Sequence, residues 1–477
     1  MAHRFAFMLS LLAALAGVRA GAWAGVRPEA RAGQVDRIVE RVARIRESSG
    51  MASAWLVMVE GERTLVDRGF GIRAWDDPRP VSERDYYRLG SISKAFTGLA
   101  LLEAAELGCL DLDAPVRTYV DNPPLTNRWS ASRPVTIAML MEQTAGWHDM
   151  SGFEFKYNDP VSLDEALALR PESRASRWPP GRHHSYTSSG PGMAAWVLEK
   201  ACGRDFEAFA RERVFEPLGM PSAAFTRTAE VERYLVGGYD TDPKQPIRYW
   251  HFLYRPAGAL NVRPGEMAKF LKMLLQRGRL DGRQVFNPGQ IERMETPATT
   301  LAARAGMDYG YGLGIYADIE DGRRYFAHGG DADGYLTRFG YNPESKRGFF
   351  VVITMFDHDP LREMRESLES WVVEPLPRTT PAPHAPATGA LEKLAGSYRR
   401  ATIRFPRDGW REDRMQIRAD GDRLEYRTGR RWRLLIPVAP NLFRRPGDPV
   451  ATAFIGEHDG KVYAQGEFGN WVKDSGG

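Results

Sequence analysis

The segment RLGSISKAFTG, residues 88–98, decides how the chain is interpreted, because it places one lysine in an otherwise apolar helix. Between Ala95 and Ala105 nearly every residue is apolar or small, so a helix that begins at Ser91 would be buried on most sides. Lys94 follows Ser91 by three residues, and residues three apart share one face of a helix. A buried amine with a lowered pKa beside a hydroxyl can activate a serine nucleophile without a histidine. Taken alone, the segment also fits a lysine that extends from a surface helix into solvent.

Two later segments each place polar groups at the end of an apolar element. The first is HHSYTSSGPGMAAWVLEKACG, residues 183–203, which reads as a short polar turn followed by an apolar helix. The second is FAHGGDADGYLTRFGYNP, residues 326–343, which places a histidine and two glycines at the end of a strand. The polar and glycine positions of interest are Tyr186 and Ser188 in the first segment and His328, Gly329 and Gly330 in the second.

With these three motifs the chain resembles the serine hydrolases related to class C β-lactamases, D,D-carboxypeptidases, D-aminopeptidases and family VIII esterases. The Ser-x-x-Lys motif of that family matches Ser91 and Lys94, and its Tyr-x-Asn motif matches Tyr186 to Ser188. Its Lys/His-x-Gly motif matches His328-Gly329-Gly330. The order and spacing agree from about residue 35 to residue 373, so the resemblance is specific to the superfamily and leaves the substrate open.

The resemblance implies a mechanism that passes through an acyl-enzyme. Ser91 would attack a carbonyl, Lys94 and Tyr186 would share the general-base work, and the backbone N–H groups of Ser91 and Asp331 would form the oxyanion hole. The resemblance implies neither a cofactor nor a metal ion. A free phenol has a pKa near ~10, so the sequence does not decide whether Lys94 or Tyr186 is the base.

Three positions bear on the choice of substrate. Ser188 stands where the family usually has Asn and offers one hydroxyl instead of a carboxamide, which bears on recognition of a substrate amide. Asp331 and Asp333 follow the glycine pair and could contact a substrate amine, as in a D-aminopeptidase, or could simply be solvated. His328 stands where the β-lactamases have a lysine that attracts a substrate carboxylate. Lys94 would lower the pKa of His328 and Asp331 would raise it, so the sequence leaves the direction open.

The distribution of strand and helix signals predicts an α/β (α+β) fold with two domains. Strand signals at 51–71 return at 309–316, 323–330 and 348–356, with helical patterns between them and an amphipathic helix at 359–373. We therefore expect one antiparallel sheet flanked by helices, with an inserted all-helical region, as in β-lactamases and transpeptidases. The expected boundaries are a serine hydrolase domain at 25–375, a Pro-rich linker at 376–389 and a small, lipocalin-like all-β barrel at 390–477.

The first residues predict export. A basic start, a short apolar run and small residues before residue 25 are typical of a cleaved secretory signal at 1–24, which implies a periplasmic or secreted protein. The apolar run is too short for a stable membrane span. One bridge between Cys109 and Cys202 is compatible with export, although two cysteines do not make a disulfide scaffold. A formal net charge of +4 gives no support for a nucleic-acid partner.

Two classes of function remain. The first is an exported serine hydrolase that cleaves a small ester or amide through an acyl-enzyme on Ser91; its enzymatic alternative is a D-specific peptidase, a D,D-carboxypeptidase or a weak β-lactamase. The second is a catalytically retired protein that binds peptidoglycan or a sensor ligand. The expected partner of the enzyme is a small-molecule ester, an amide or a D-amino-acid peptide. The sequence does not decide whether the protein forms an oligomer.

Overall fold

The computed structural model describes residues 28–149, 156–169, 171–387, 389–405 and 413–474, and the predicted signal at 1–24 lies outside these residues. A six-stranded antiparallel sheet has the order β2-β1-β10-β9-β8-β7. Its strands are β1 (Ser53–Glu60), β2 (Arg63–Gly71), β7 (Tyr316–Glu320), β8 (Arg323–Ala332), β9 (Tyr335–Asn342) and β10 (Arg347–Ile353). The early hairpin thus pairs with late strands, as the sequence predicts, but residues 309–315 form no strand and β7 begins only at Tyr316.

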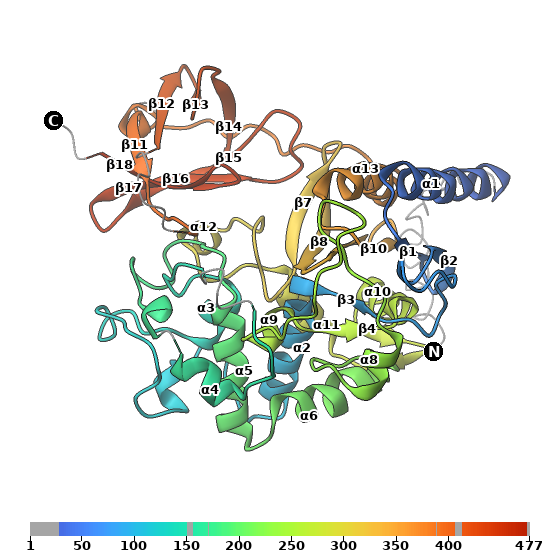
Figure 1. Cartoon of the computed structure of the whole chain (residues 1–477). Helices are drawn as coiled ribbons and strands as arrows, with labels where there is room; N and C mark the ends of the chain where they lie inside the picture. Colours follow the sequence, from blue (N-terminus) through green and yellow to red (C-terminus); the bar gives the residue numbers. More distant parts are fainter. Residues whose placement is uncertain (1–27, 150–155, 170, 388, 406–412, 475–477) are drawn as a thin grey trace, which may run out of the picture.

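The two faces of the sheet pack against different layers. Successive side chains of a strand point to opposite faces, so Trp55 and Val57 belong to one core and Leu56 and Met58 to the other. The second core is closed by α1 (Pro28–Ser49) and α13 (His358–Val373), which lie side by side in Figure 1. The first core faces the inserted helical region.

The inserted region lies between β2 and β7 and carries two long helices and many short elements. Its helices are α2 (Ser93–Glu106), α3 (Ile137–Met141), α4 (Leu163–Ala168), α5 (Ser189–Cys202), α6 (Phe206–Ala210), α7 (Glu216–Leu218), α8 (Ala229–Tyr234), α9 (Arg255–Gly258), α10 (Met267–Leu275), α11 (Pro288–Glu295) and α12 (Leu301–Arg304). Two small ladders pair β3 (Tyr87–Arg88) with β4 (Asn261–Val262) and β5 (Arg279–Leu280) with β6 (Arg283–Gln284).

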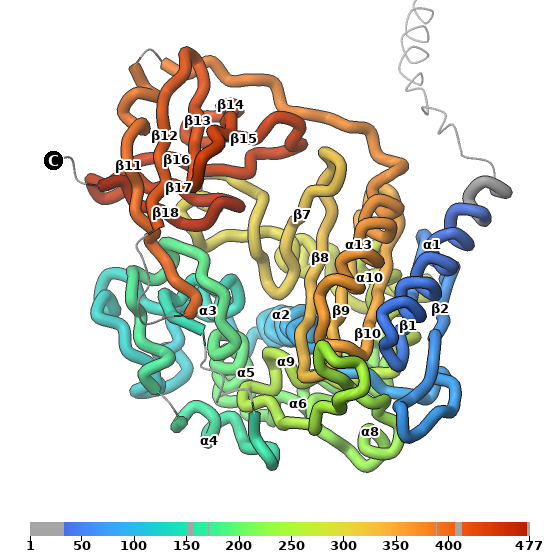
Figure 2. The backbone as a smooth tube through the Cα atoms, turned by 45° about the horizontal axis from the view of Figure 1, so that its top comes forward, coloured from blue at the N-terminus to red at the C-terminus, as the bar shows by residue number. Residues whose placement is uncertain are grey.

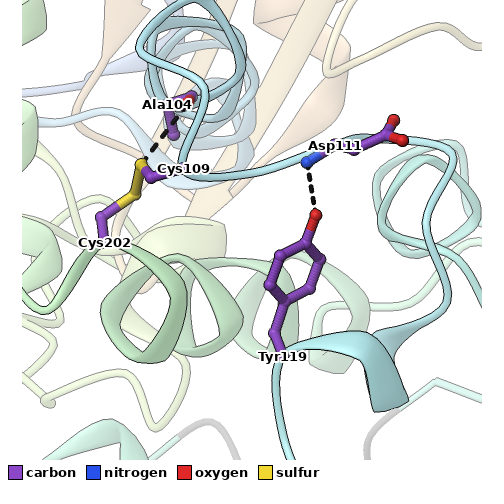
Figure 3. Close-up of a disulfide and its surroundings, with 5 residues drawn as sticks. All are labelled: Ala104, Cys109, Asp111, Tyr119 and Cys202. Carbon is purple, nitrogen blue, oxygen red and sulfur yellow. Dashed lines mark hydrogen bonds between the residues drawn. A yellow bond between two sulfur atoms is a disulfide. The ribbon is translucent and has the colours of Figure 1, made fainter.

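Helix α2 is buried on almost all sides, from Ser93 to Ala104. A disulfide between Cys109 and Cys202 joins the segment after α2 to the last residue of α5, and Cys109 Sγ also contacts the carbonyl of Ala104 (Figure 3). The bridge that the sequence left open is therefore present. It ties together the two helices that begin next to the candidate site residues.

The C-terminal strands form a closed eight-stranded barrel, as predicted. Its strands are β11 (Gly396–Arg400), β12 (Arg414–Asp420), β13 (Arg423–Arg427), β14 (Arg433–Ala439), β15 (Leu442–Arg444), β16 (Ala453–His458), β17 (Lys461–Gly466) and β18 (Gly469–Lys473). The turn between β16 and β17 is Asp459-Gly460, both with positive φ, which suits a two-residue hairpin. Residues 377–387 before the barrel form neither helix nor strand.

The barrel packs directly on the larger part of the chain. The side chain of Gln465 donates to the backbone carbonyl of Arg182 at 2.7 Å, and that of Asn470 donates to the carbonyl of His184 at 2.8 Å. In Figure 2 the orange segment that follows β11 leaves the barrel and extends toward α3. The barrel thus holds the segment that leads into α5. No helix in the described parts of the chain is long and apolar enough to cross a membrane.

Candidate active site

The turn that carries Ser91 packs backbone to backbone against the end of strand β8. A short 3₁₀ turn, η1 (Gly90–Ile92), precedes α2, and Gly90 has φ +55°. A Cβ on Gly90 would lie 2.6 Å from the backbone nitrogen of Asp331, and one on Gly330 would lie 1.9 Å from the carbonyl oxygen of Leu89. Only glycine tolerates this approach, so the two glycines bring the Ser91 turn and the backbone of Asp331 together.

Lys94 lies behind Ser91 and is completely buried. Its Nζ is 3.0 Å from Ser91 Oγ and donates to the carbonyl oxygen of Ala257 at 2.7 Å. The lysine therefore does not extend into solvent. Burial lowers the pKa of Lys94 to about 7, while the nearby carboxylates of Asp149 and Asp331 partly oppose this shift. At this pKa the amine can accept a proton from the adjacent hydroxyl near neutral pH.

Tyr186 is the second polar neighbour of Ser91. Its side chain interacts with that of Ser91, and the centre of its ring lies 4.8 Å from Lys94 Nζ. Burial raises the pKa of Tyr186 well above its usual value, so the phenol carries its proton at neutral pH. The structure therefore brings Ser91, Lys94 and Tyr186 into one cluster. In this cluster the pKa of the Lys94 amine is lowered and the pKa of the Tyr186 phenol is raised.

Ser188 immediately precedes helix α5 and lines the cleft in front of Ser91. Its backbone N–H donates to Asp149 Oδ1 at 2.9 Å. The other oxygen of Asp149 accepts two hydrogen bonds from Arg404, from Nε at 2.9 Å and from Nη2 at 2.7 Å. The sequence analysis missed Asp149 and Arg404. No local signal marks them, because they come from separate parts of the chain and meet only in the folded protein.

His328 is buried, with 2% of its surface exposed, and is not among the residues that line the cleft. Its Nδ1 contacts the carbonyl oxygen of Gly329, which only accepts hydrogen bonds, so Nδ1 carries the proton and Nε2 accepts one from the Tyr311 hydroxyl at 2.7 Å. Burial, with a smaller effect of Lys94, lowers the pKa of His328 to about 3. The direction that the sequence left open is downward, and His328 is uncharged at neutral pH.

The cleft in front of Ser91 has a volume of about 290 Å³. Ser91 and Ser188 line it together with residues of both charges: Arg88, Lys156 and Arg404 are basic, and Asp331 and Asp333 are acidic. Asp333 Oδ1 lies 3.8 Å from Lys156 Nζ, so this carboxylate faces a cation of the protein as well as the cleft. Lys94 and Tyr186 are not among the residues that line the cleft.

A serine hydroxyl beside a buried lysine of lowered pKa is an arrangement found in serine hydrolases that activate the serine without a histidine. The chain belongs to the beta-lactamase family, since the family model described as Beta-lactamase matches residues 35–370. It is 26% identical over 371 residues to penicillin-binding protein 4 of Amycolatopsis lactamdurans, a match that covers 73% of this chain and 93% of the relative. The chain spans 64% and 63% of the length of two further curated relatives, less than two thirds of each.

Two solved structures share the fold. An octameric penicillin-binding protein homologue from Pyrococcus abyssi aligns with a TM-score of 0.61 at 22% identity, over 92% of this chain and 100% of that one. A D-alanine carboxypeptidase AmpC from Burkholderia cenocepacia aligns with a TM-score of 0.57 at 17% identity, over 71% and 99%. At these identities the likeness concerns the fold alone.

Proposed function

We propose that the protein is an exported serine hydrolase that cleaves a small ester or amide through an acyl-enzyme on Ser91. The observation that carries this proposal is the 3.0 Å contact between Ser91 Oγ and the buried Nζ of Lys94. Among the described residues no carboxylate is in direct contact with Lys94 Nζ, and a lysine buried in this way costs free energy, which is explained if the amine has a chemical task. Export rests on the residues at 1–24 alone.

The pKa shifts favour Lys94 as the base. The neutral amine takes the proton of Ser91 Oγ as the oxygen–carbon bond to the substrate carbonyl forms. The backbone N–H groups of Ser91 and Asp331 are the donors proposed for the oxyanion. Tyr186, protonated at neutral pH, gives its proton to the leaving group and regains one from Lys94. Water then attacks the ester on Ser91, and the proton transfers run in reverse.

The experiment that tests this function is incubation of the full chain with a fluorophosphonate, followed by mass mapping of the labelled peptide. A fluorophosphonate reacts with an activated serine whatever the natural substrate is, so it separates an enzyme from a retired binding protein. The close contact of Ser91 with Lys94 argues against retirement.

A D-specific peptidase or carboxypeptidase is the second candidate, and one observation favours it. Arg88 lines the cleft, has 3% of its surface exposed, and its buried Nε and Nη1 have no hydrogen-bond partner among the described residues. A buried guanidinium gains stability from an acceptor, and the carboxylate of a peptide terminus would supply one. Turnover of matched D- and L-terminal dipeptides separates this candidate from an esterase.

Ser188→Asn is expected to raise amide or β-lactam hydrolysis relative to ester hydrolysis by about tenfold, which corresponds to one hydrogen bond. Ser188 lines the cleft while its backbone is held by Asp149, so the longer side chain changes what the cleft offers to a substrate amide. The measurement is the ratio of kcat/KM for an amide and an ester with the same acyl group. Ser188→Ala is the control and should not raise the ratio; an unchanged ratio in both variants would mean that Ser188 does not contact the acyl group.

His328 should not contribute to the pH dependence near neutrality. Its pKa of about 3 keeps it neutral between pH 5 and pH 9, so kcat/KM for an ester with a carboxylate and for a neutral ester should change in parallel. Both should fall as the pH drops through about 7, because Lys94 is then protonated. A carboxylated ester that alone loses kcat/KM as the pH rises from 5.5 to 7.5 would show that His328 is charged and faces the substrate.

A further inference from the structure

We propose that the barrel supplies a positioning residue to the hydrolytic site: Arg404 holds Asp149 and the ring of Tyr186 in place. Catalysis then depends on a residue outside the part of the chain that the family model matches. The proposal rests on the proposed function of Ser91. Arg404 lies beyond residues 35–370, in the segment 401–405 that follows β11, yet it lines the same cleft as Ser91.

The first contact joins Arg404 to Asp149 through both backbone and side chain. The Arg404 guanidinium donates twice to Asp149 Oδ2, and the backbone N–H of Asp149 donates to the carbonyl oxygen of Arg404 at 2.8 Å. The Asp149 side chain is fully buried, and a buried carboxylate is destabilising when its cation is removed. Its second oxygen accepts the N–H of Ser188 at the start of α5. Arg404 therefore fixes the turn that lies two residues after Tyr186.

The second contact is with Tyr186 itself. The Arg404 guanidinium carbon lies 4.6 Å from the centre of the Tyr186 ring, and Lys94 Nζ lies 4.8 Å from the same centre. Both distances are within the range in which a cation is attracted to an aromatic face. The guanidinium limits the rotation of the ring and so keeps the Tyr186 hydroxyl directed at Ser91.

Two other barrel residues support the same segment. Gln465 and Asn470, from β17 and β18, bind the carbonyl oxygens of Arg182 and His184. The backbone on both sides of Tyr186 is thus held from the barrel, at 182–184 by these amides and at Ser188 through Asp149 and Arg404. A displacement of about 1 Å at a reacting group can cost about a hundredfold in rate, so this support is large enough to matter for turnover.

The charges of Asp149 and Arg404 also change the pKa of Lys94. Among the described residues, the charged groups that act on the amine are the carboxylates of Asp149 and Asp331, which raise its pKa, and Arg404, which lowers it. Tyr186 and His328, the other titratable neighbours, are uncharged at neutral pH. Removal of the Arg404 charge should therefore move the acidic limb of the kcat/KM profile to higher pH, and removal of the Asp149 charge should move it to lower pH.

The test compares Arg404→Met, Asp149→Asn and the double variant in the full chain, with a nitrophenyl ester as substrate. We expect Arg404→Met to lose about tenfold to a hundredfold in kcat, with a smaller change in KM, and to shift the acidic limb upward. Asp149→Asn should shift that limb downward, and the double variant should return it close to the wild-type position while kcat stays low. Arg404→Lys should restore the limb but not the full kcat, since it keeps the charge without the two-pronged contact.

The matched control is Arg418→Met, which removes an exposed barrel arginine paired with Glu425 and should leave kcat and the profile unchanged. A fall in melting temperature with unchanged kcat and unchanged profile in Arg404→Met would overturn the proposal and make Arg404 a structural residue only. If Arg404→Met is insoluble, the double variant, which leaves no unpaired buried carboxylate, carries the test: wild-type kcat there overturns the proposal. Failure of the fluorophosphonate to label Ser91 in the unmutated chain would instead refute the proposed function.

Discussion

Ser91→Ala is expected to abolish labelling by a fluorophosphonate and to lower kcat for a short-chain nitrophenyl ester by at least about 10⁴-fold. The physical reason is that no other group in the cluster can form the acyl bond, because Lys94 is directed at Ser91 and Tyr186 keeps its proton. Binding and the backbone donors remain, so a small residual rate is expected. The measurement is mass mapping of the labelled peptide together with ester turnover in the full chain.

The control for this prediction is Ser397→Ala, which removes an exposed serine of the barrel and should leave both the label and the rate unchanged. The melting temperature of Ser91→Ala should stay close to that of the wild type, since a small hydroxyl is replaced by a methyl group. A label that maps to another residue, or wild-type turnover in Ser91→Ala, contradicts the proposed acyl-enzyme.

The sequence predicts those parts of the site that depend on local geometry. Ser91 and Lys94 lie three residues apart in a helix, so their mutual orientation follows from helix geometry once the apolar surroundings indicate burial. The antiparallel sheet and the barrel can also be predicted from the sequence, because alternating strands and two-residue turns are local patterns. Tyr186 and His328 were predicted as site residues from the resemblance to a family. No local pattern in the sequence would have placed them near Ser91.

What the sequence did not predict depends on contacts between distant segments. In the sequence, Asp149 and Arg404 look like ordinary charged residues of loops. Only the fold buries the Asp149 side chain and pairs it with Arg404. The environment of His328 is similar: the pKa of a histidine near the end of a strand depends on its burial, and here Tyr311 and the surrounding core exclude water from it. Burial decides both cases, and burial is a property of the whole fold.

Lys94→Met is expected to lower kcat by about 10²-fold to 10⁴-fold, the usual range for loss of a general base, while the protein becomes more stable. Met keeps the length of the side chain and removes an amine that burial penalises. The carbonyl of Ala257 loses its donor, which costs about 1 kcal/mol, less than the several kcal/mol that correspond to the lowered pKa of the amine.

The gain in stability should depend on pH in a direction that the Lys94 pKa fixes. An unfolded lysine has a pKa of ~10.4 and the folded one about 7, so between these values unfolding takes up a proton and the wild type becomes more stable as the pH rises. Below pH 7 the full penalty of the buried cation remains. The difference in melting temperature between Lys94→Met and the wild type should therefore be largest below pH 7 and shrink toward pH 10, whereas Lys461→Met, at an exposed barrel position, should show no such trend. A variant that is inactive and also less stable at every pH would mean that Lys94 contributes mainly packing and hydrogen bonds, and that its amine is not held in a strained state for proton transfer.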